Sequence, residues 1–83
     1  MKLRPGVFLA EVEYGTALLH EERGEYWNLN PTGALILETV LAGGTLDEAA
    51  RALADEYAVD LNSAARDVEE LLDELCSAGL VEQ

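Results

Sequence analysis

Residues 24–34, GEYWNLNPTGA, decide the fold because the character of the chain changes within them. Residues 25–29 are rich in large aromatic and aliphatic side chains, which is typical of a strand. Asn30 can cap a helix, and Pro31 suits a first helical turn, where its missing N–H would have no partner anyway. A strand is therefore expected to end here and a helix to begin at once.

The segment ahead of this junction lacks helical periodicity and breaks into short β-favouring runs separated by glycines. Tyr14-Gly15 supplies one tight turn, and residues 21–24 supply a longer one in which Gly24 can take the positive φ that hairpin closure often requires. Three antiparallel strands are expected, at about residues 7–13, 16–20 and 25–29.

Behind the junction the pattern is helical. Gly43-Gly44 ends the first helix, residues 45–48 form a capping box for the second, and Asp60 caps a third that stops at Gly79. The helices are expected at about residues 31–42, 46–57 and 61–78. The sequence thus predicts an α+β fold in one domain, residues 1–83, with a three-stranded antiparallel β-meander followed by three α-helices. This order resembles a winged helix-turn-helix.

The charge balance argues against nucleic acid as a partner. The chain has 17 acidic and 5 basic side chains, giving a net charge of −12, which repels a phosphate backbone and attracts a basic peptide. A winged-helix DNA-binding regulator stays as a distant alternative because of the predicted fold. Its recognition helix would, however, carry several carboxylates into the DNA groove.

The sequence contains no pattern typical of an enzyme or a metal site. His20 is interpreted as a solvated group at a strand end and Cys76 as a small core residue, and no glycine-rich phosphate loop is present. We expect no catalysis, cofactor or metal. A single cysteine excludes an internal disulfide, and no signal sequence or membrane span is found, so a soluble, cytoplasmic protein is expected.

The third predicted strand has an unprotected edge. Side chains alternate along a strand, so Tyr26 and Trp27 lie on opposite faces, and we expect Trp27 and Leu29 to pack under the helices while Tyr26 is exposed. As the last strand of a meander it is an edge strand, and neither proline nor lysine blocks it. Its free N–H and C=O groups can pair with an added peptide strand.

Residues 24–34 also resemble the strand-to-helix junction of PqqD-like peptide-binding domains, which are called RiPP recognition elements. The resemblance continues through residues 45–50, the Asp67-Val68 to Leu71-Leu72 to Leu75 spacing and Gly79-Leu80-Val81, and so covers nearly the whole chain. It implies binding of the leader segment of a ribosomally made precursor peptide, as an added strand beside the third strand and over a groove walled by the third helix.

The aromatic pair before Leu-Asn-Pro-Thr-Gly-Ala looks most like the lasso-peptide branch of this family. That likeness implies a leader with a Tyr-x-x-Pro element, a cysteine-type leader peptidase and a macrolactam-forming cyclase as partners. The acidic third helix adds the expectation of a basic leader. A peptide chaperone of pyrroloquinoline-quinone or of another modified-peptide pathway is the alternative.

The expected peptide site combines the edge strand with one side of the third helix. Main-chain groups of the strand would hold the peptide, apolar side chains would receive its tyrosine and proline, and acidic side chains would attract its lysines. Its expected residues are Glu25, Tyr26, Trp27, Asn28, Leu29, Asp67, Val68, Glu70, Leu71, Leu72, Glu74 and Leu75.

Overall fold

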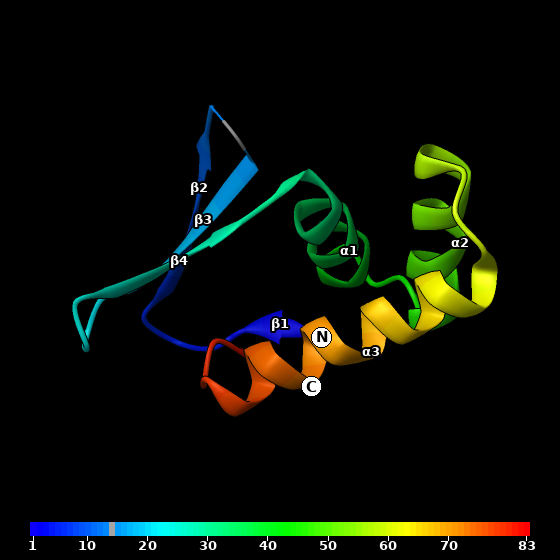
Figure 1. Cartoon of the computed structure of the whole chain (residues 1–83). Helices are drawn as coiled ribbons and strands as arrows, with labels where there is room; N and C mark the ends of the chain where they lie inside the picture. Colours follow the sequence, from blue (N-terminus) through cyan, green and yellow to red (C-terminus); the bar gives the residue numbers. More distant parts are fainter. Residues whose placement is uncertain (14) are drawn as a thin grey trace.

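The computed structural model describes residues 1–13 and 15–83, so the Tyr14 half of the expected Tyr14-Gly15 turn lies outside the described residues. A three-stranded antiparallel sheet stands beside three helices, and the longest helix runs beneath the other two (Figure 1). The predicted α+β fold is confirmed. The elements are β2 (Val7–Val12), β3 (Gly15–His20), β4 (Glu25–Leu29), α1 (Pro31–Leu41), α2 (Leu46–Tyr57) and α3 (Leu61–Ser77).

Two further strands were not predicted. β1 (Lys2–Leu3) and β5 (Val81–Glu82) pair antiparallel, with Leu3 opposite Val81. Each has only two residues, too few to show an alternating pattern, and they come from opposite ends of the chain. Their pairing brings the two termini together beside α3 (Figure 1).

The sheet has the strand order β2-β3-β4, so β4 is an edge strand, as expected. Leu18 of β3 pairs with Leu9 of β2 on one side and with Trp27 of β4 on the other. Leu18 is completely buried, which identifies this row as the side of the sheet that faces the helices. Every second residue along each strand shares that side.

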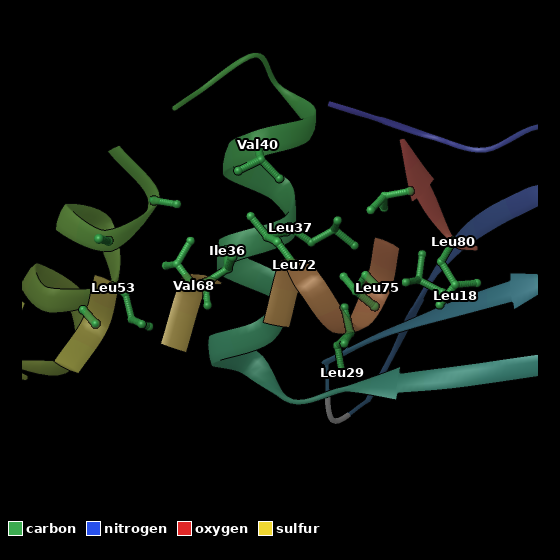
Figure 2. Close-up of a cluster of buried hydrophobic side chains, with 14 of the residues drawn as sticks. Leu18, Leu29, Ile36, Leu37, Val40, Leu53, Val68, Leu72, Leu75 and Leu80 are labelled. Atoms are coloured by element: carbon green, nitrogen blue, oxygen red, sulfur yellow. The ribbon is translucent and has the colours of Figure 1, made fainter. Parts of the chain in front are cut away.

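One hydrophobic core joins the sheet to all three helices (Figure 2). Leu18 and Leu29 come from the sheet, Leu37 from α1 and Leu75 from α3, and Leu80 follows α3 directly. These side chains are at most 9% exposed. The core therefore holds one side of β3 and the end of β4 against the helices, and leaves the outer edge of β4 uncovered.

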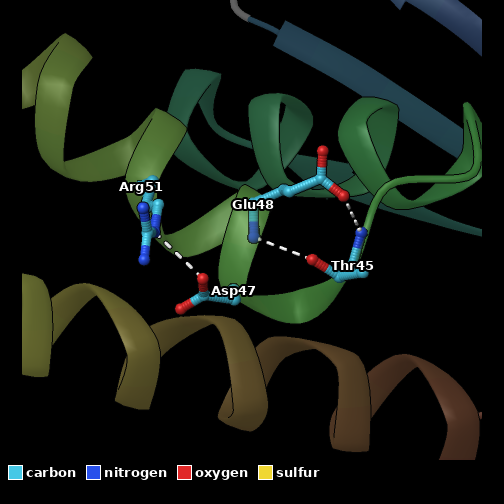
Figure 3. A network of polar contacts seen from close by, with 4 residues as sticks. All are labelled: Thr45, Asp47, Glu48 and Arg51. Carbon is cyan, nitrogen blue, oxygen red and sulfur yellow. Dashed lines mark hydrogen bonds and ion pairs between the residues drawn. The ribbon is translucent and has the colours of Figure 1, made fainter.

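The helix starts follow the sequence signals. Asn30 caps α1 by accepting hydrogen bonds from the Gly33 N–H (2.9 Å) and the Thr32 hydroxyl (2.8 Å). At α2, Thr45 Oγ1 accepts from the Glu48 N–H (3.1 Å), while Glu48 Oε1 accepts from the Thr45 N–H (3.0 Å; Figure 3). These bonds satisfy N–H groups that have no partner inside the helix.

The capping box also affects the ionisation of Glu48. Its hydrogen bonds with the Thr45 backbone and side chain hold the pKa of the Glu48 carboxyl below its ordinary value. A lowered folded-state pKa contributes stability that is present above the unfolded pKa and is lost as the pH falls through the folded one. Asp47 and Arg51, one turn apart, form an exposed ion pair of 2.9 Å on the same helix (Figure 3).

Two single residues differ from expectation. His20 is 7% exposed rather than solvated, because it shares the helix-facing side of β3 with Leu18, and its Nδ1 has no hydrogen-bond partner. Cys76 is exposed rather than in the core, because Leu75 takes the inward position and the next helical residue is rotated away. Among the described residues, no helix is long and apolar enough to cross a membrane.

Gly15 is expected to be the most sensitive glycine of the sheet. Its φ is +146°, and a Cβ there would collide with the carbonyl oxygen of Leu29 at the end of β4. Gly24 has φ +66° but nothing near its Cβ direction. Gly15→Ala should therefore lower the free energy of unfolding by about 3 kcal/mol, and Gly24→Ala by about 1 kcal/mol, in urea denaturation. If both variants lost the same free energy of unfolding, the close approach of Gly15 to the Leu29 carbonyl would be contradicted.

Candidate functional site

The backbone groups at the open edge of β4 follow from the strand register. His20, which pairs with Glu25, accepts a hydrogen bond from the Gly24 N–H (3.0 Å), so its backbone groups point toward β4. Backbone groups alternate in direction along an antiparallel strand. Every second residue from Glu25 therefore bonds to β3, and the residues between them, Tyr26 and Asn28, direct their N–H and C=O groups to the open edge.

The two aromatic residues of β4 lie on opposite faces, as expected. Trp27 pairs with Leu18 on the side of the helices and is 39% exposed, so it is only partly covered. Tyr26 is 69% exposed and aligns with Leu19 and Phe8 in one row across the outer face. A strand added at this edge would place alternate side chains beside Trp27 and beside Tyr26.

A groove of about 590 Å³ continues from the end of this edge. It opens at Asn30, directly after β4, and runs between the start of α1, the end of α2 and one side of α3. Ile36, Leu53 and Leu71 supply apolar surface inside it. The groove therefore offers apolar contacts to a segment lying along α3.

One wall of the groove is acidic. Asp67, Glu70 and Glu74 recur at three- and four-residue spacing on α3 and so share one flank of the helix. No lining residue in the described part of the chain is basic. This flank favours a ligand that carries positive charge.

The structure brings only part of the expected site together. Asp67, Glu70, Leu71 and Glu74 line the groove, and Glu25, Tyr26, Trp27 and Asn28 are exposed on the neighbouring strand. Val68, Leu72 and Leu75 lie in the core instead, with exposed fractions of 0%, 4% and 1%, and Leu29 is buried at 9%. The apolar stripe of α3 is thus mainly core, and Leu71 alone of its expected site leucines reaches the groove.

Sequence reasoning missed the far end of the groove. Tyr57, the last residue of α2, and Val59, in the α2–α3 connection, line it, and both are more than 40% exposed. Large apolar residues on either side of a helix end, where polar residues are usual, were the available signal. In the described part of the chain, no three or more His, Cys, Asp or Glu side chains are grouped to hold a metal ion.

Comparison with known proteins agrees with this geometry. Residues 15–81 match the family of coenzyme PQQ synthesis protein D, PqqD. The fold is similar to a solved lasso peptide synthetase B1 complexed with the leader peptide, with a TM-score of 0.92 and 38% identity over 99% of this chain and 96% of that one. None of the curated proteins compared matches the chain.

A second similar structure is TbiB1 in complex with the TbiA(β) leader peptide. Its TM-score is 0.85 and its identity 28%, over 100% of this chain and 98% of that one. Both similar proteins were therefore solved with a leader peptide bound.

Proposed function

The chain belongs to the PqqD family, and from this we propose that it binds the leader segment of a ribosomally synthesised precursor peptide of the lasso type. The observation that carries the proposal is the open edge of β4 beside the groove on α3. Both similar structures contain leader peptides, and one is a lasso peptide synthetase component, which favours the lasso branch over a pyrroloquinoline-quinone chaperone.

Main-chain pairing supplies the part of the affinity that does not depend on the leader sequence. Tyr26 and Asn28 each offer one N–H and one C=O at the edge, so an extended peptide can form up to four hydrogen bonds there. A typical net contribution is about 1 kcal/mol for each bond. These bonds alone are too weak for stable capture, and side-chain contacts must add the rest.

The groove supplies the selective part. The peptide side chains that point toward the helices would meet Trp27 and then the apolar surface that includes Leu71 and Ile36. An aromatic ring and a proline, as in a Tyr-x-x-Pro element, are stiff apolar groups that lose little entropy when they enter such a surface. Main-chain pairing and groove contacts together fit a Kd between about micromolar and nanomolar, which is tight enough for capture and weak enough for release.

Leader capture would serve delivery rather than catalysis. We place a cysteine-type leader peptidase and a macrolactam-forming cyclase downstream of the bound complex. Binding along β4 and α3 holds the leader in one extended conformation and leaves the rest of the precursor peptide free for these enzymes. The outer face of the sheet, with Tyr26, stays uncovered in this arrangement.

A proline scan of the two sheet edges tests strand addition. Asn28→Pro removes an N–H that points to the open edge of β4, and Glu11→Pro makes the same change at the opposite edge, on β2. Fluorescence anisotropy with a labelled Tyr-x-x-Pro leader should show saturable binding by the wild type, at least tenfold weaker binding by Asn28→Pro, and no change for Glu11→Pro.

The same titration includes two ligand controls. A leader in which the tyrosine and proline are replaced by alanine should lose most of its affinity, and a labelled DNA duplex should not bind. Wild-type affinity in Asn28→Pro, with the fold intact by circular dichroism, would rule out pairing through this edge.

The acidic flank of the groove is expected to speed capture of a basic leader. Asp67→Lys with Glu70→Lys should lower the association rate about tenfold at low salt and flatten its salt dependence, in stopped-flow fluorescence. Glu69→Lys with Asp73→Lys changes the net charge equally, at two carboxylates of α3 that do not line the groove. If the association rate falls equally in both double variants, the net charge of the protein, and not this flank, steers the leader.

A further inference from the structure

A peptide that pairs with the open edge of β4 and lies along α3 would contact two separate elements, and each end of β4 is joined to the helices in its own way. At one end the chain itself joins them, through Asn30 and α1. At the other end the loop between β3 and β4 meets the end of α3, where the Arg23 Nη1 donates a hydrogen bond to the carbonyl oxygen of Ala78 at 3.0 Å. Among the side-chain hydrogen bonds of the described residues, this bond alone joins segments far apart in the sequence.

The end of α3 is built to accept this contact. The N–H groups of Gly79 and Leu80 bond to the carbonyls of Cys76 and Leu75, each at 3.0 Å, which closes the helix in a Schellman motif. The Ala78 carbonyl takes no part in these two bonds, so it can accept a hydrogen bond from a donor outside the helix. The last turn of α3 carries no basic residue of its own, so a cation brought from elsewhere meets the negative end of the helix dipole.

Gly79 lies beside the guanidinium of Arg23, within van der Waals reach. Its φ is +75°, and a Cβ there would stand 3.4 Å from the Arg23 Nη2. The contact therefore combines a hydrogen bond, a favourable charge and close packing. It ties residues 21–28, which are all exposed to solvent, to the half-buried Ala78 and Gly79 at the end of α3.

We infer that Arg23 is a positioning residue for peptide capture, which fixes the spacing between β4 and α3 before the peptide arrives. The inference rests on the proposed function. Without the bond, the β3–β4 loop and the start of β4 can move relative to α3, and binding must first order them. With the bond, the loop ahead of β4 is tied to the end of α3, so the position of β4 relative to α3 is set before the peptide arrives.

The chain carries a natural pair of probes for this spacing. Trp27 is the single tryptophan and lies on β4, and Cys76 is the single cysteine and lies exposed on α3. Cys76 does not line the groove, so a label there leaves the peptide site open. Energy transfer from Trp27 to a small acceptor on Cys76, measured by time-resolved fluorescence, reports the distribution of distances between β4 and α3.

The test compares wild type, Arg23→Ala and Arg23→Lys with Arg66→Ala, which removes an exposed cation elsewhere on α3. Arg23→Ala should broaden the distance distribution, and a saturating leader without tryptophan should narrow it again. The affinity of Arg23→Ala for the leader should fall about fivefold, because binding must now order β4 relative to α3. Arg23→Lys keeps a charged donor and should recover most of the affinity, while Arg66→Ala should match the wild type in both measurements.

Two results would overturn the inference. One is an unchanged distance distribution and affinity in Arg23→Ala. The other is an equal loss of affinity in Arg66→Ala, which would make the effect one of net charge. Failure of the wild type to bind any leader would instead count against the proposed function, and the distance distributions of the free proteins would still show whether Arg23 sets the spacing.

Discussion

The unpaired edge of β4 is the constraint on which the rest of the structure depends. An exposed strand edge normally invites aggregation, and proteins protect it with proline, lysine, a bulge or a covering element. β4 carries none of the protecting residues, and its two edge-directed positions, Tyr26 and Asn28, keep their hydrogen-bonding groups available. A groove with an acidic flank lies next to this edge. The combination favours binding of a basic, extended peptide over unspecific aggregation at the edge.

The core explains how an edge strand can stay open and still keep its place. Only the last residue of β4, Leu29, is buried, and the Asn30 cap starts α1 directly behind it, so the strand is anchored at one end. The bond from Arg23 to Ala78 holds the loop ahead of its other end. Between these two anchors the strand is held mainly by its pairing with β3. A small domain has little surplus stability and needs its contacts to stay folded. Here most of those contacts lie in the core, away from the edge where a ligand must bind.

Local signals made most of the fold predictable from the sequence. Asn30-Pro31, the Thr45–Glu48 capping box and Asp60 each fix a helix start through neighbouring residues, and the observed caps use these same side chains. Features that depend on residues far apart in the sequence could not be predicted in this way. Pairing of β1 with β5, burial of His20 and the contact of Arg23 with Ala78 depend on which segments meet in space. For the same reason the broad stripe of α3 did not reveal that Val68, Leu72 and Leu75 face the core while Leu71 faces the groove.

Amide hydrogen exchange of the labelled protein, measured by NMR with and without a saturating leader peptide, tests the central claim most directly. In the free protein the amides of Tyr26 and Asn28 should exchange much faster than those of Trp27 and Leu29, whose N–H groups point toward β3. Leader binding should slow Tyr26 and Asn28 at least tenfold. Tight leader binding that leaves both amides exchanging as in the free protein would contradict capture by strand addition at β4.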